Sequence, residues 1–286
     1  MQTLNLIGAG RVGQTLGRLW QERGVFAIQN VLNHSAASAE VACRFIGAGN
    51  PVNALAQMRP ADVWMLAVPD AQIESVAGAL ADHAGATNDH REPIVFHCSG
   101  AQSSALLAPL ALLGWQTASA HCILSFASAD AAIQQFPGTA CALEGDASAI
   151  AALQTAFSAI QARCFEVQSS NKLLYHAAAV FATNFLPVIQ AVAEDAWLAS
   201  GVPQDLLPGL RTSLLSNAVA NITRLGPAGA LTGPAARGDV TAIAKQAVAV
   251  TQWDAQAGAA YEVLSALALR MAKATTDTSA TSASTN

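Results

Sequence analysis

The sequence predicts an α/β protein in which a Rossmann-type, doubly wound parallel sheet is followed by an all-α C-terminal domain. Three observations lead to this prediction. An apolar run at residues 4–7 leads directly into Gly-x-Gly-x-x-Gly and then into apolar residues at helical spacing. Strand and helix patterns then alternate as far as Gln168, as a sheet with crossover helices requires. Beyond Gln168 every segment has the pattern of a helix.

The glycine-rich turn predicts a nucleotide site. Gly8 permits the sharp bend, Gly10 lets a pyrophosphate approach the backbone, and Gly13 lets the following helix pack close to the strand. The phosphates are expected on the N–H groups at the start of the helix, at Arg11, Val12 and Gly13. The alternative is a tight strand-to-helix turn without a ligand.

The end of the second strand, residues 26–32, bears on the choice of cofactor. It is followed by Asn33, His34 and Ser35, and no acidic residue occurs before Glu40. NAD-binding folds place an acidic side chain here for the ribose 2′-hydroxyl, and a carboxylate would repel a 2′-phosphate. Asn33, His34 and Ser35 can donate hydrogen bonds to that phosphate, with help from Arg11, so we expect NADP(H). The alternative is that they are ordinary turn residues.

The remaining elements follow in order along the chain. Further strands are expected at residues 62–68, 93–98, 115–120, 139–143 and 164–167, and helices at 39–46, 103–113 and 147–162. The helical part is expected to contain helices at residues 171–200, 204–225, 239–251 and 255–273. These patterns predict an NADP-binding domain at residues 1–168, a helical domain at 169–273 and a disordered tail at 274–286.

Polar residues at three strand ends are candidates for a site. Ligands of open α/β sheets bind beyond the carboxyl ends of the strands. The three ends are Val68-Pro69-Asp70, His97-Cys98-Ser99-Gly100 and Ala120-His121-Cys122. We expect the nicotinamide near Val68, Pro69 and Ser99. Each residue taken alone could equally be a strand-end cap.

The first long helix of the C-terminal part carries polar residues on one face. Lys172 and His176 are four residues apart, and Thr183 and Asn184 continue the same stripe. Reduction of a carbonyl or imine requires a proton, which a lysine of lowered pKa or a neighbouring histidine can supply. The alternatives are a solvated lysine and a packed histidine. In a later loop, Arg237 could bind a substrate carboxylate or pair with Asp239.

Composition excludes several classes of protein. The net charge of −5 and the absence of Lys/Arg runs argue against a nucleic-acid partner. The five cysteines are widely spaced without a CxxC pair, which predicts reduced thiols in the cytoplasm and neither a metal site nor disulfides. The apolar residues 177–193 are interrupted by polar residues and Pro187, so we expect a buried helix rather than a membrane span.

Seven motifs together resemble a known family. They are GAGRVGQTLG, VLNHS, AVPDAQI, VFHCSGAQSS, SAHCILSF, NKLLYHAAAVFATN and ALTGPAARGD. The combination resembles the bacterial Rossmann-like proteins that carry a C-terminal helical domain of unknown function. These belong to the 6-phosphogluconate dehydrogenase-like superfamily, with pyrroline-5-carboxylate reductase and ketopantoate reductase. The resemblance covers roughly residues 4–270.

The resemblance implies an NADP-dependent reductase of a small 2-oxo acid or imine, with ketopantoate reductase-like activity as the leading specific expectation. It also implies a homodimer joined through the helical domains. The lysine of related hydroxyacid dehydrogenases corresponds to Lys172, and His176 occupies a position that is often Asn in those relatives.

We expect the substrate between the two domains, with Lys172 as proton donor and with His176 and Asn184 orienting the substrate or the lysine. Two alternatives remain open at this point. One is a non-catalytic NADP(H)-binding sensor or assembly protein. The other is an oxidoreductase that links NADP to a deazaflavin cofactor.

Overall fold

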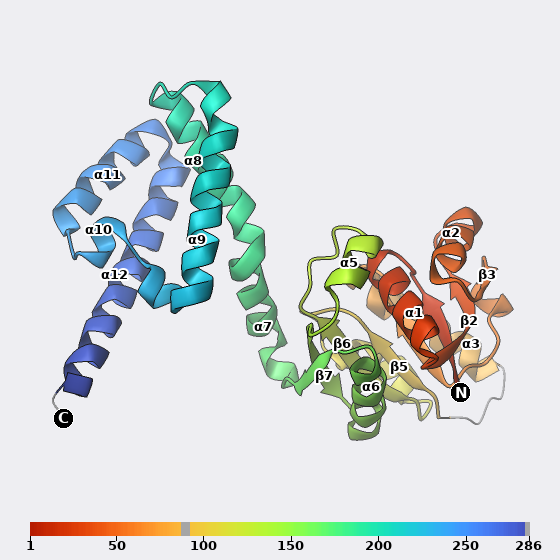
Figure 1. Cartoon of the computed structure of the whole chain (residues 1–286). Coiled ribbons are helices and arrows are strands. Elements are labelled where there is room, and N and C mark those ends of the chain that lie inside the picture. Colours follow the sequence, from red (N-terminus) through yellow and green to blue (C-terminus); the bar gives the residue numbers. More distant parts are fainter. Residues whose placement is uncertain (87–91, 284–286) are drawn as a thin grey trace. The chain divides into compact units, whose positions relative to one another are not determined.

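The computed structural model of the chain describes residues 1–86 and 92–283 (Figure 1). The chain divides into two compact units, Met1–Thr183 and Asn184–Asn286. The first unit contains the sheet and its covering helices, and the second contains helices (Figure 1).

The described part of the chain forms one eight-stranded sheet of order β3-β2-β1-β4-β5-β6-β7-β8. Its strands are β1 (Gln2–Ile7), β2 (Phe26–Leu32), β3 (Asn50–Val52), β4 (Val63–Leu66), β5 (Ile94–His97), β6 (Gln116–Cys122), β7 (Ala140–Gly145) and β8 (Arg163–Glu166). Neighbouring strands from β3 to β6 pair in parallel. The order reverses direction beside β1, as in doubly wound folds, so the predicted Rossmann-type fold class is confirmed.

The sheet is not parallel throughout, which corrects one detail of the prediction. Strand β7 pairs antiparallel with β6, and β8 pairs parallel with β7. The alternation of apolar patterns identifies strands but carries no information on their direction. Gly145 lies at the β6–β7 contact, where a Cβ would come 2.3 Å from the carbonyl oxygen of Thr117. Only glycine permits this close approach of the two strands.

Alternate residues of the central strands face two separate cores. In β4, Val63 and Met65 belong to one core, whereas Trp64 and Leu66 belong to the other. The first core is covered by α1 (Arg11–Arg23), α2 (Ala36–Ile46) and α6 (Ala147–Ala159), and the second by α3 (Ile73–Ala86) and α4 (Ala108–Ala111). A sheet covered on both faces places its strand ends at an edge, where a site can form.

Trp20 lies at the centre of the first core. Its side chain is fully buried and makes edge contacts with the rings of Phe26, Phe96 and Phe157. Its indole Nε1 donates to the carbonyl oxygen of Ala156, 3.0 Å away. These contacts fix α1, and therefore the glycine turn before it, against the sheet.

Several boundaries differ from the predicted ones for local reasons. Helix α2 begins at Ala36 instead of residue 39 because the Ser35 hydroxyl accepts from the Ser38 N–H as an N-cap. Helix α6 ends at Ala159 instead of residue 162, just before Gln161, which has a left-handed φ of 68°. The expected helix at residues 103–113 divides into a 3₁₀ turn, Ser104–Leu107, and α4. Strand β3 and helix α5 (Ala129–Gln135) were not predicted.

The helix expected at residues 171–200 contains a π-helical turn. Helix α7 (Lys172–Ala179) leads into Val180–Asn184 and then into α8 (Phe185–Ala199). Pro187 has no N–H for the carbonyl four residues earlier, which explains an altered hydrogen-bond register here. The boundary between the two compact units falls at this turn, between Thr183 and Asn184. The change from strands to helices does occur at Gln168, and the domain boundary placed there stays a prediction.

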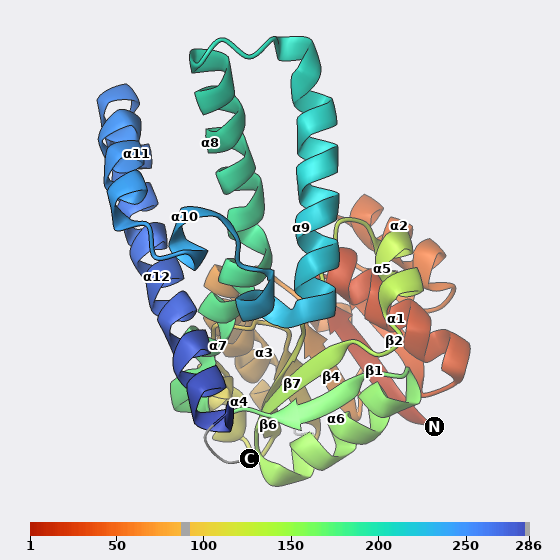
Figure 2. The same cartoon turned by 60° about the vertical axis from the view of Figure 1, so that its left-hand side comes forward.

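The second unit consists of α8, α9 (Leu207–Ala230), α10 (Gly233–Ala236), α11 (Val240–Trp253) and α12 (Ala255–Ala283). In α9 the helix is broken at Gly226, which has a φ of 71°. Helix α11 packs against α12 (Figure 2). Helix α12 extends into the segment predicted as a disordered tail, and side chains beyond residue 274 lie outside the described part, so that tail also stays a prediction.

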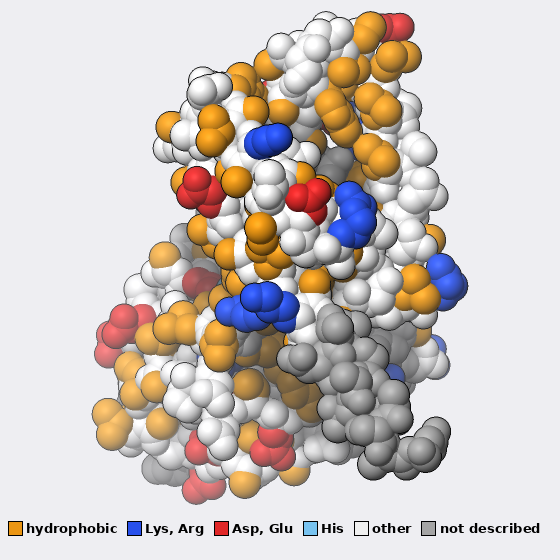
Figure 3. Space-filling model, turned by 90° about the vertical axis from the view of Figure 1, so that its left-hand side faces the viewer, with side chains coloured by type: hydrophobic (Ala, Val, Ile, Leu, Met, Phe, Trp, Pro, Cys, Tyr) orange, Lys and Arg blue, Asp and Glu red, His pale blue; other side chains and the backbone are white. Residues whose placement is uncertain are grey.

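The second unit buries few apolar side chains. Among its described residues only Leu207 and Ala247 are buried apolar side chains, whereas Val188, Val219 and Val263 are more than half exposed. Figure 3 shows hydrophobic side chains across much of this part of the surface. The expectation that residues 177–193 form a buried helix is therefore wrong for the single chain. By length and composition the run Ser169–Ala199 could also cross a membrane.

Candidate functional site

The three glycines of the first turn have three different surroundings. Gly8 has a φ of 85°, and a Cβ there would lie 2.6 Å from Cγ1 of Val68. At Gly13 a Cβ would lie 3.2 Å from the carbonyl oxygen of Gly8, so α1 packs closely on the strand end. At Gly10 a Cβ would meet nothing within 4 Å. The structure thus leaves open space where the sequence predicts a pyrophosphate.

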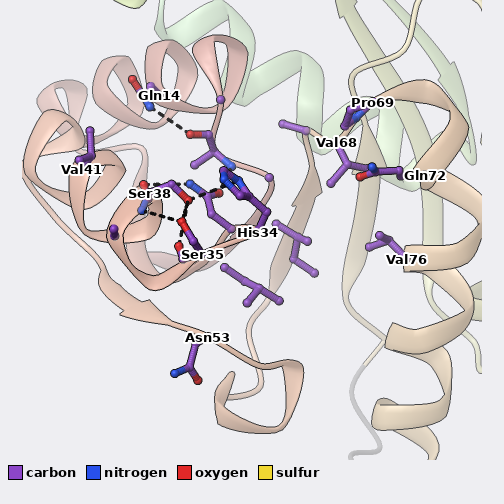
Figure 4. A pocket seen from close by; sticks show the side chains of 18 of the residues that line it. Gln14, His34, Ser35, Ser38, Val41, Asn53, Val68, Pro69, Gln72 and Val76 are labelled. Atoms are coloured by element: carbon purple, nitrogen blue, oxygen red, sulfur yellow. Dashed lines mark hydrogen bonds between the residues drawn. The ribbon is translucent and has the colours of Figure 1, made fainter.

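A cavity of about 790 Å³ borders this turn. Figure 4 shows His34, Ser35 and Ser38 on one side of it and Val68, Pro69, Gln72 and Val76 on the other. Most of the predicted cofactor residues line it, namely Gly8, Gly10, Asn33, His34, Ser35, Val68 and Pro69. The cavity lies in the size range of small-molecule and cofactor sites.

The other three predicted cofactor residues do not line this cavity with the rest. The guanidinium of Arg11 reaches instead toward the carbonyl oxygen of Phe126, at 3.4 Å. Val12 lines a second cavity described below. Helix α1 has no side-chain cap and no acidic residue in its first turn. The first N–H groups of this helix can therefore bind a phosphate at the cavity.

Asn33 ties the end of β2 to the glycine turn. Its Oδ1 accepts from the N–H of Ala9 at 2.6 Å, and its Nδ2 donates to the carbonyl oxygen of Ser38 at 3.0 Å. Both ends of the amide are thus engaged within the protein, so its first role is to shape the cavity wall. At this wall His34 and the first N–H groups of α2 can donate to an anion, whereas the hydroxyl of Ser35 donates to Oγ of Ser38.

A second cavity, of about 230 Å³, is lined by residues from α1, β6 and α7 and by the residues after β4 and β5. Its polar lining side chains are Asp70, Ser99, His121 and His176. Asp70 follows Pro69 directly, so adjacent residues line the two cavities. The strand ends singled out in the sequence are therefore brought together here.

Ser99 is engaged by several groups at the floor of the second cavity. Its hydroxyl donates to Oδ2 of Asp70 at 2.6 Å and accepts from the N–H groups of Ala101 and Gln102. The N–H of Ser99 donates to Nδ1 of His97 at 3.2 Å. This pattern is that of a residue that fixes the loop after β5.

His121 and Tyr175 form a hydrogen-bonded pair. Nδ1 of His121 and the hydroxyl of Tyr175 share a hydrogen bond of 2.8 Å, and burial raises the pKa of Tyr175, so its hydroxyl keeps its proton. Burial, and then repulsion from His176 and Lys172, lower the pKa of His121 to about 4. His121 is therefore neutral near pH 7.

His176 lies across Gly100 from His121. A Cβ at Gly100 would lie 2.6 Å from Nδ1 of His176 and 2.8 Å from Nε2 of His121, so the two ring nitrogens converge on one place. Nδ1 of His176 is buried and has no hydrogen-bond partner in the described part of the chain. A buried nitrogen without a partner is costly unless a ligand or water binds it.

Lys172 is buried, with 1% of its surface exposed, which excludes the solvated lysine left open by the sequence. Its Nζ donates to Oγ of Ser119 at 2.6 Å and to the carbonyl oxygen of Ser99 at 3.1 Å. Burial lowers its pKa. Lys172 does not line the second cavity but lies behind Ser99, which does.

Three residues at this site were missed in the sequence: Tyr175, Ser119 and Glu144. Ser119 is fully buried in β6, and Glu144 is 4% exposed in β7. A carboxylate in the otherwise apolar strand Ala140–Gly145 is a signal that could have revealed Glu144. Tyr175 lies on the same first turn of α7 as Lys172.

The remaining predicted residues lie at or beyond the end of the first unit. Asn184 is exposed and is the first residue of the second unit. Arg237 is exposed at the end of α10, and Asp239 caps α11 by accepting from the N–H of Ala242. The five cysteines are free thiols. In the described residues no group of three His, Cys, Asp or Glu side chains is arranged to hold a metal ion.

The fold and the glycine-turn cavity define a Rossmann-type protein with a helical C-terminal region. Residues 2–122 match the Rossmann-like domain, and residues 139–268 match a domain of unknown function, DUF2520. The chain therefore joins a Rossmann-like domain to a DUF2520 domain. No curated protein matches the sequence.

Solved structures share this fold over nearly the whole chain. Protein TM1727 from Thermotoga maritima is 23% identical, with a TM-score of 0.75 over 95% of this chain and 99% of that one. BF3122 from Bacteroides fragilis, a candidate NADP oxidoreductase, is 21% identical, with a TM-score of 0.69 over 94% and 98%. A pyrroline-5-carboxylate reductase from Coxiella burnetii is 16% identical, with a TM-score of 0.56 over 94% and 98%.

Proposed function

We propose that the protein is an NADP-dependent oxidoreductase that reduces a small 2-oxo acid or imine, with ketopantoate as the leading specific substrate. The observation that carries the proposal is the 790 Å³ cavity beside Gly10, where a side chain would meet nothing within 4 Å. The similarity to BF3122, described as an NADP oxidoreductase, and to the Coxiella pyrroline-5-carboxylate reductase supports the same class of reaction.

The cavity wall after β2 favours the 2′-phosphate of NADP over the free hydroxyl of NAD. No described residue that lines this cavity is acidic, and the place of the usual carboxylate is taken by Asn33. The N-terminus of α2 adds the positive end of a helix dipole, with no acidic residue in its first turn. His34 supplies a side-chain hydrogen-bonding group there, and the hydroxyl of Ser35 can donate to the phosphate if it turns away from Oγ of Ser38.

The second cavity is the proposed place of the reaction. Its 230 Å³ is small for a ligand site, which favours a substrate with few heavy atoms. A nicotinamide bound between the two cavities would supply the hydride. In the tautomer that carries its proton on Nε2, the neutral His121 can then donate a hydrogen bond to the substrate oxygen or nitrogen.

His176 lines this cavity, and its Nδ1 has no partner among the described residues, so His176 is the proposed proton donor to the substrate. This differs from the role expected for Lys172. The lysine is one hydrogen bond behind the cavity, where its positive charge stabilises negative charge that develops on the substrate. Asn184 stays a candidate for orienting the substrate.

NADPH consumption tests the proposal. The purified protein is assayed with NADPH and a panel of 2-oxo acids, ketopantoate among them, and cyclic imines. We expect turnover with at least one member and its loss in His176→Asn. Thermal shifts with NADP, NAD and a deazaflavin identify the cofactor. Stabilisation by NADP without any turnover would favour a non-catalytic sensor or assembly protein. Activity that depends on the deazaflavin would favour an oxidoreductase that links NADP to a deazaflavin.

We also propose that the helical unit pairs with a second copy of the chain in the cytoplasm. A unit with so few buried apolar side chains lacks a core of its own, and a matching surface from another protomer would cover it. The free thiols fit the reducing cytoplasm.

The oligomeric state checks this pairing. Light scattering is expected to give a dimer. Val188→Asp in α8, where the side chain is 58% exposed, should produce monomer. Leu112→Asp, in the first unit and 87% exposed, is the matched control and should remain dimeric. A monomeric native protein would contradict the pairing.

A further inference from the structure

Glu144 is a buried carboxylate that binds serines from three separate elements. Oε1 accepts from the hydroxyls of Ser104 at 2.8 Å and Ser169 at 2.6 Å. Oε2 accepts from the N–H of Ser104 at 2.9 Å and from the hydroxyl of Ser119 at 2.8 Å. Burial alone would raise the pKa of Glu144, but these hydrogen bonds together hold it below its usual value. Glu144 is therefore a carboxylate at neutral pH.

Ser119 connects this carboxylate to Lys172. The hydroxyl of Ser119 has one proton, which it donates to Glu144, and it accepts a proton from Nζ of Lys172 at 2.6 Å. Another proton of Nζ goes to the carbonyl oxygen of Ser99, which lines the second cavity. A continuous hydrogen-bonded chain thus runs from Glu144 to the cavity floor.

The charges around Lys172 show why this connection matters. Burial lowers the pKa of Lys172, whereas the negative charges of Glu144 and then Asp70 oppose that shift. His176 follows one turn later on α7. Four other titratable side chains lie close to Lys172 and are uncharged near pH 7: His97, His121, Cys98 and Cys141. Burial lowers the pKa of the two histidines, and the pKa of each of the two thiols is raised. Of these two carboxylates, Glu144 raises the pKa of Lys172 more than Asp70 does.

We propose that Glu144 is a positioning residue that acts through Ser119 to keep the Lys172 ammonium charged and fixed against the carbonyl of Ser99, below the second cavity. The catalytic consequence rests on the proposed function. The charge on Lys172 can be measured without any turnover, so the two claims can fail separately.

The chain has only three lysines, Lys172, Lys245 and Lys273, and the latter two are exposed. Lysine labelled with ¹³C at Cε therefore gives three NMR signals that can be titrated with pH and assigned by substitution. In the native protein we expect Lys172 to titrate below the usual range of a lysine side chain. Removal of the carboxylate charge in Glu144→Gln should lower the titration midpoint of Lys172 by about one further pH unit or more.

Two further variants and a control make the test specific. Ser119→Ala breaks the connection with little change in volume and should also lower the Lys172 titration, whereas Ser119→Thr keeps the hydroxyl and should restore it. Asp146→Asn is the matched control, because Asp146 binds the N–H and hydroxyl of Thr117 in the same strand pair without contacting Lys172. It should leave the titration unchanged.

An unchanged Lys172 titration in both Glu144→Gln and Ser119→Ala would overturn the proposal. Where turnover is found, the alkaline limb of the pH profile of kcat should move to lower pH in Glu144→Gln and Ser119→Ala. It should remain in place in Ser119→Thr. A shifted titration in a protein that never consumes NADPH would leave the connection intact and refute only the proposed function.

Discussion

Asn33→Asp is the substitution that tests cofactor choice most sharply. The aspartate keeps an oxygen for the N–H of Ala9, which Asn33 binds at 2.6 Å, so the glycine turn retains its support. It loses the donor to the carbonyl oxygen of Ser38 and adds a negative charge to the wall that we assign to the 2′-phosphate. We expect preference to move from NADP toward NAD.

The expected magnitude follows from Coulomb's law. Two unit charges about 5 Å apart repel by about 3 kcal/mol at an effective dielectric constant near 20. That energy corresponds to a Kd for NADP on the order of a hundredfold weaker. The lost hydrogen bond costs about 1 kcal/mol of folding free energy, which should lower Tm slightly.

Titration calorimetry with NADP and NAD at fixed ionic strength measures this change. Asn53→Asp is the control, because Asn53 lines the same cavity and gains the same charge elsewhere on its wall. It should weaken NADP binding much less. An unchanged NADP affinity in Asn33→Asp, or tighter binding of NAD than NADP by the native protein, would refute the reasoning.

Two further predictions concern the glycine turn and acid stability. Gly10→Val should retain the native Tm but bind NADP at least tenfold more weakly. Gly13→Val should lower Tm, because its Cβ would press on the carbonyl oxygen of Gly8. A large fall in Tm for Gly10→Val would contradict this prediction. Burial lowers the pKa of His121 to about 4 in the folded protein, whereas its pKa in the unfolded chain is about 6.5. The stability that comes from burying the neutral His121 is therefore complete above pH 6.5 and is lost as the pH falls toward 4. Denaturant unfolding between these pH values should therefore show a loss on the order of 3 kcal/mol that His121→Gln largely removes, and equal pH dependence in the two proteins would exclude this role.

The glycine turn could be predicted from the sequence because its chemistry is local. Gly8, Gly10 and Gly13 act through the backbone of one strand, one turn and one helix, and the structure gives each the surroundings that its position required. The strand ends at Asp70, Ser99 and His121 could also be placed at one edge, because parallel strands end together.

Burial and long-range partners could not be predicted in the same way. The spacing of Lys172 and His176 put both on one helix face, but the burial of Lys172 depends on Ser119 in a strand more than fifty residues earlier. The direction of β7 was missed because an apolar pattern reads the same in both directions. Residues 177–193 were expected to be buried because an apolar pattern predicts that a surface is covered. The pattern does not identify the surface that covers it.

The most direct test of the proposed function is NADPH oxidation by the native protein with the panel of 2-oxo acids and cyclic imines, compared with His176→Asn. We expect substrate-dependent loss of NADPH absorbance with at least one small substrate, and we expect His176→Asn to abolish this loss while it retains NADP binding. NADP binding without consumption of NADPH across the whole panel, or full activity in His176→Asn, would contradict it.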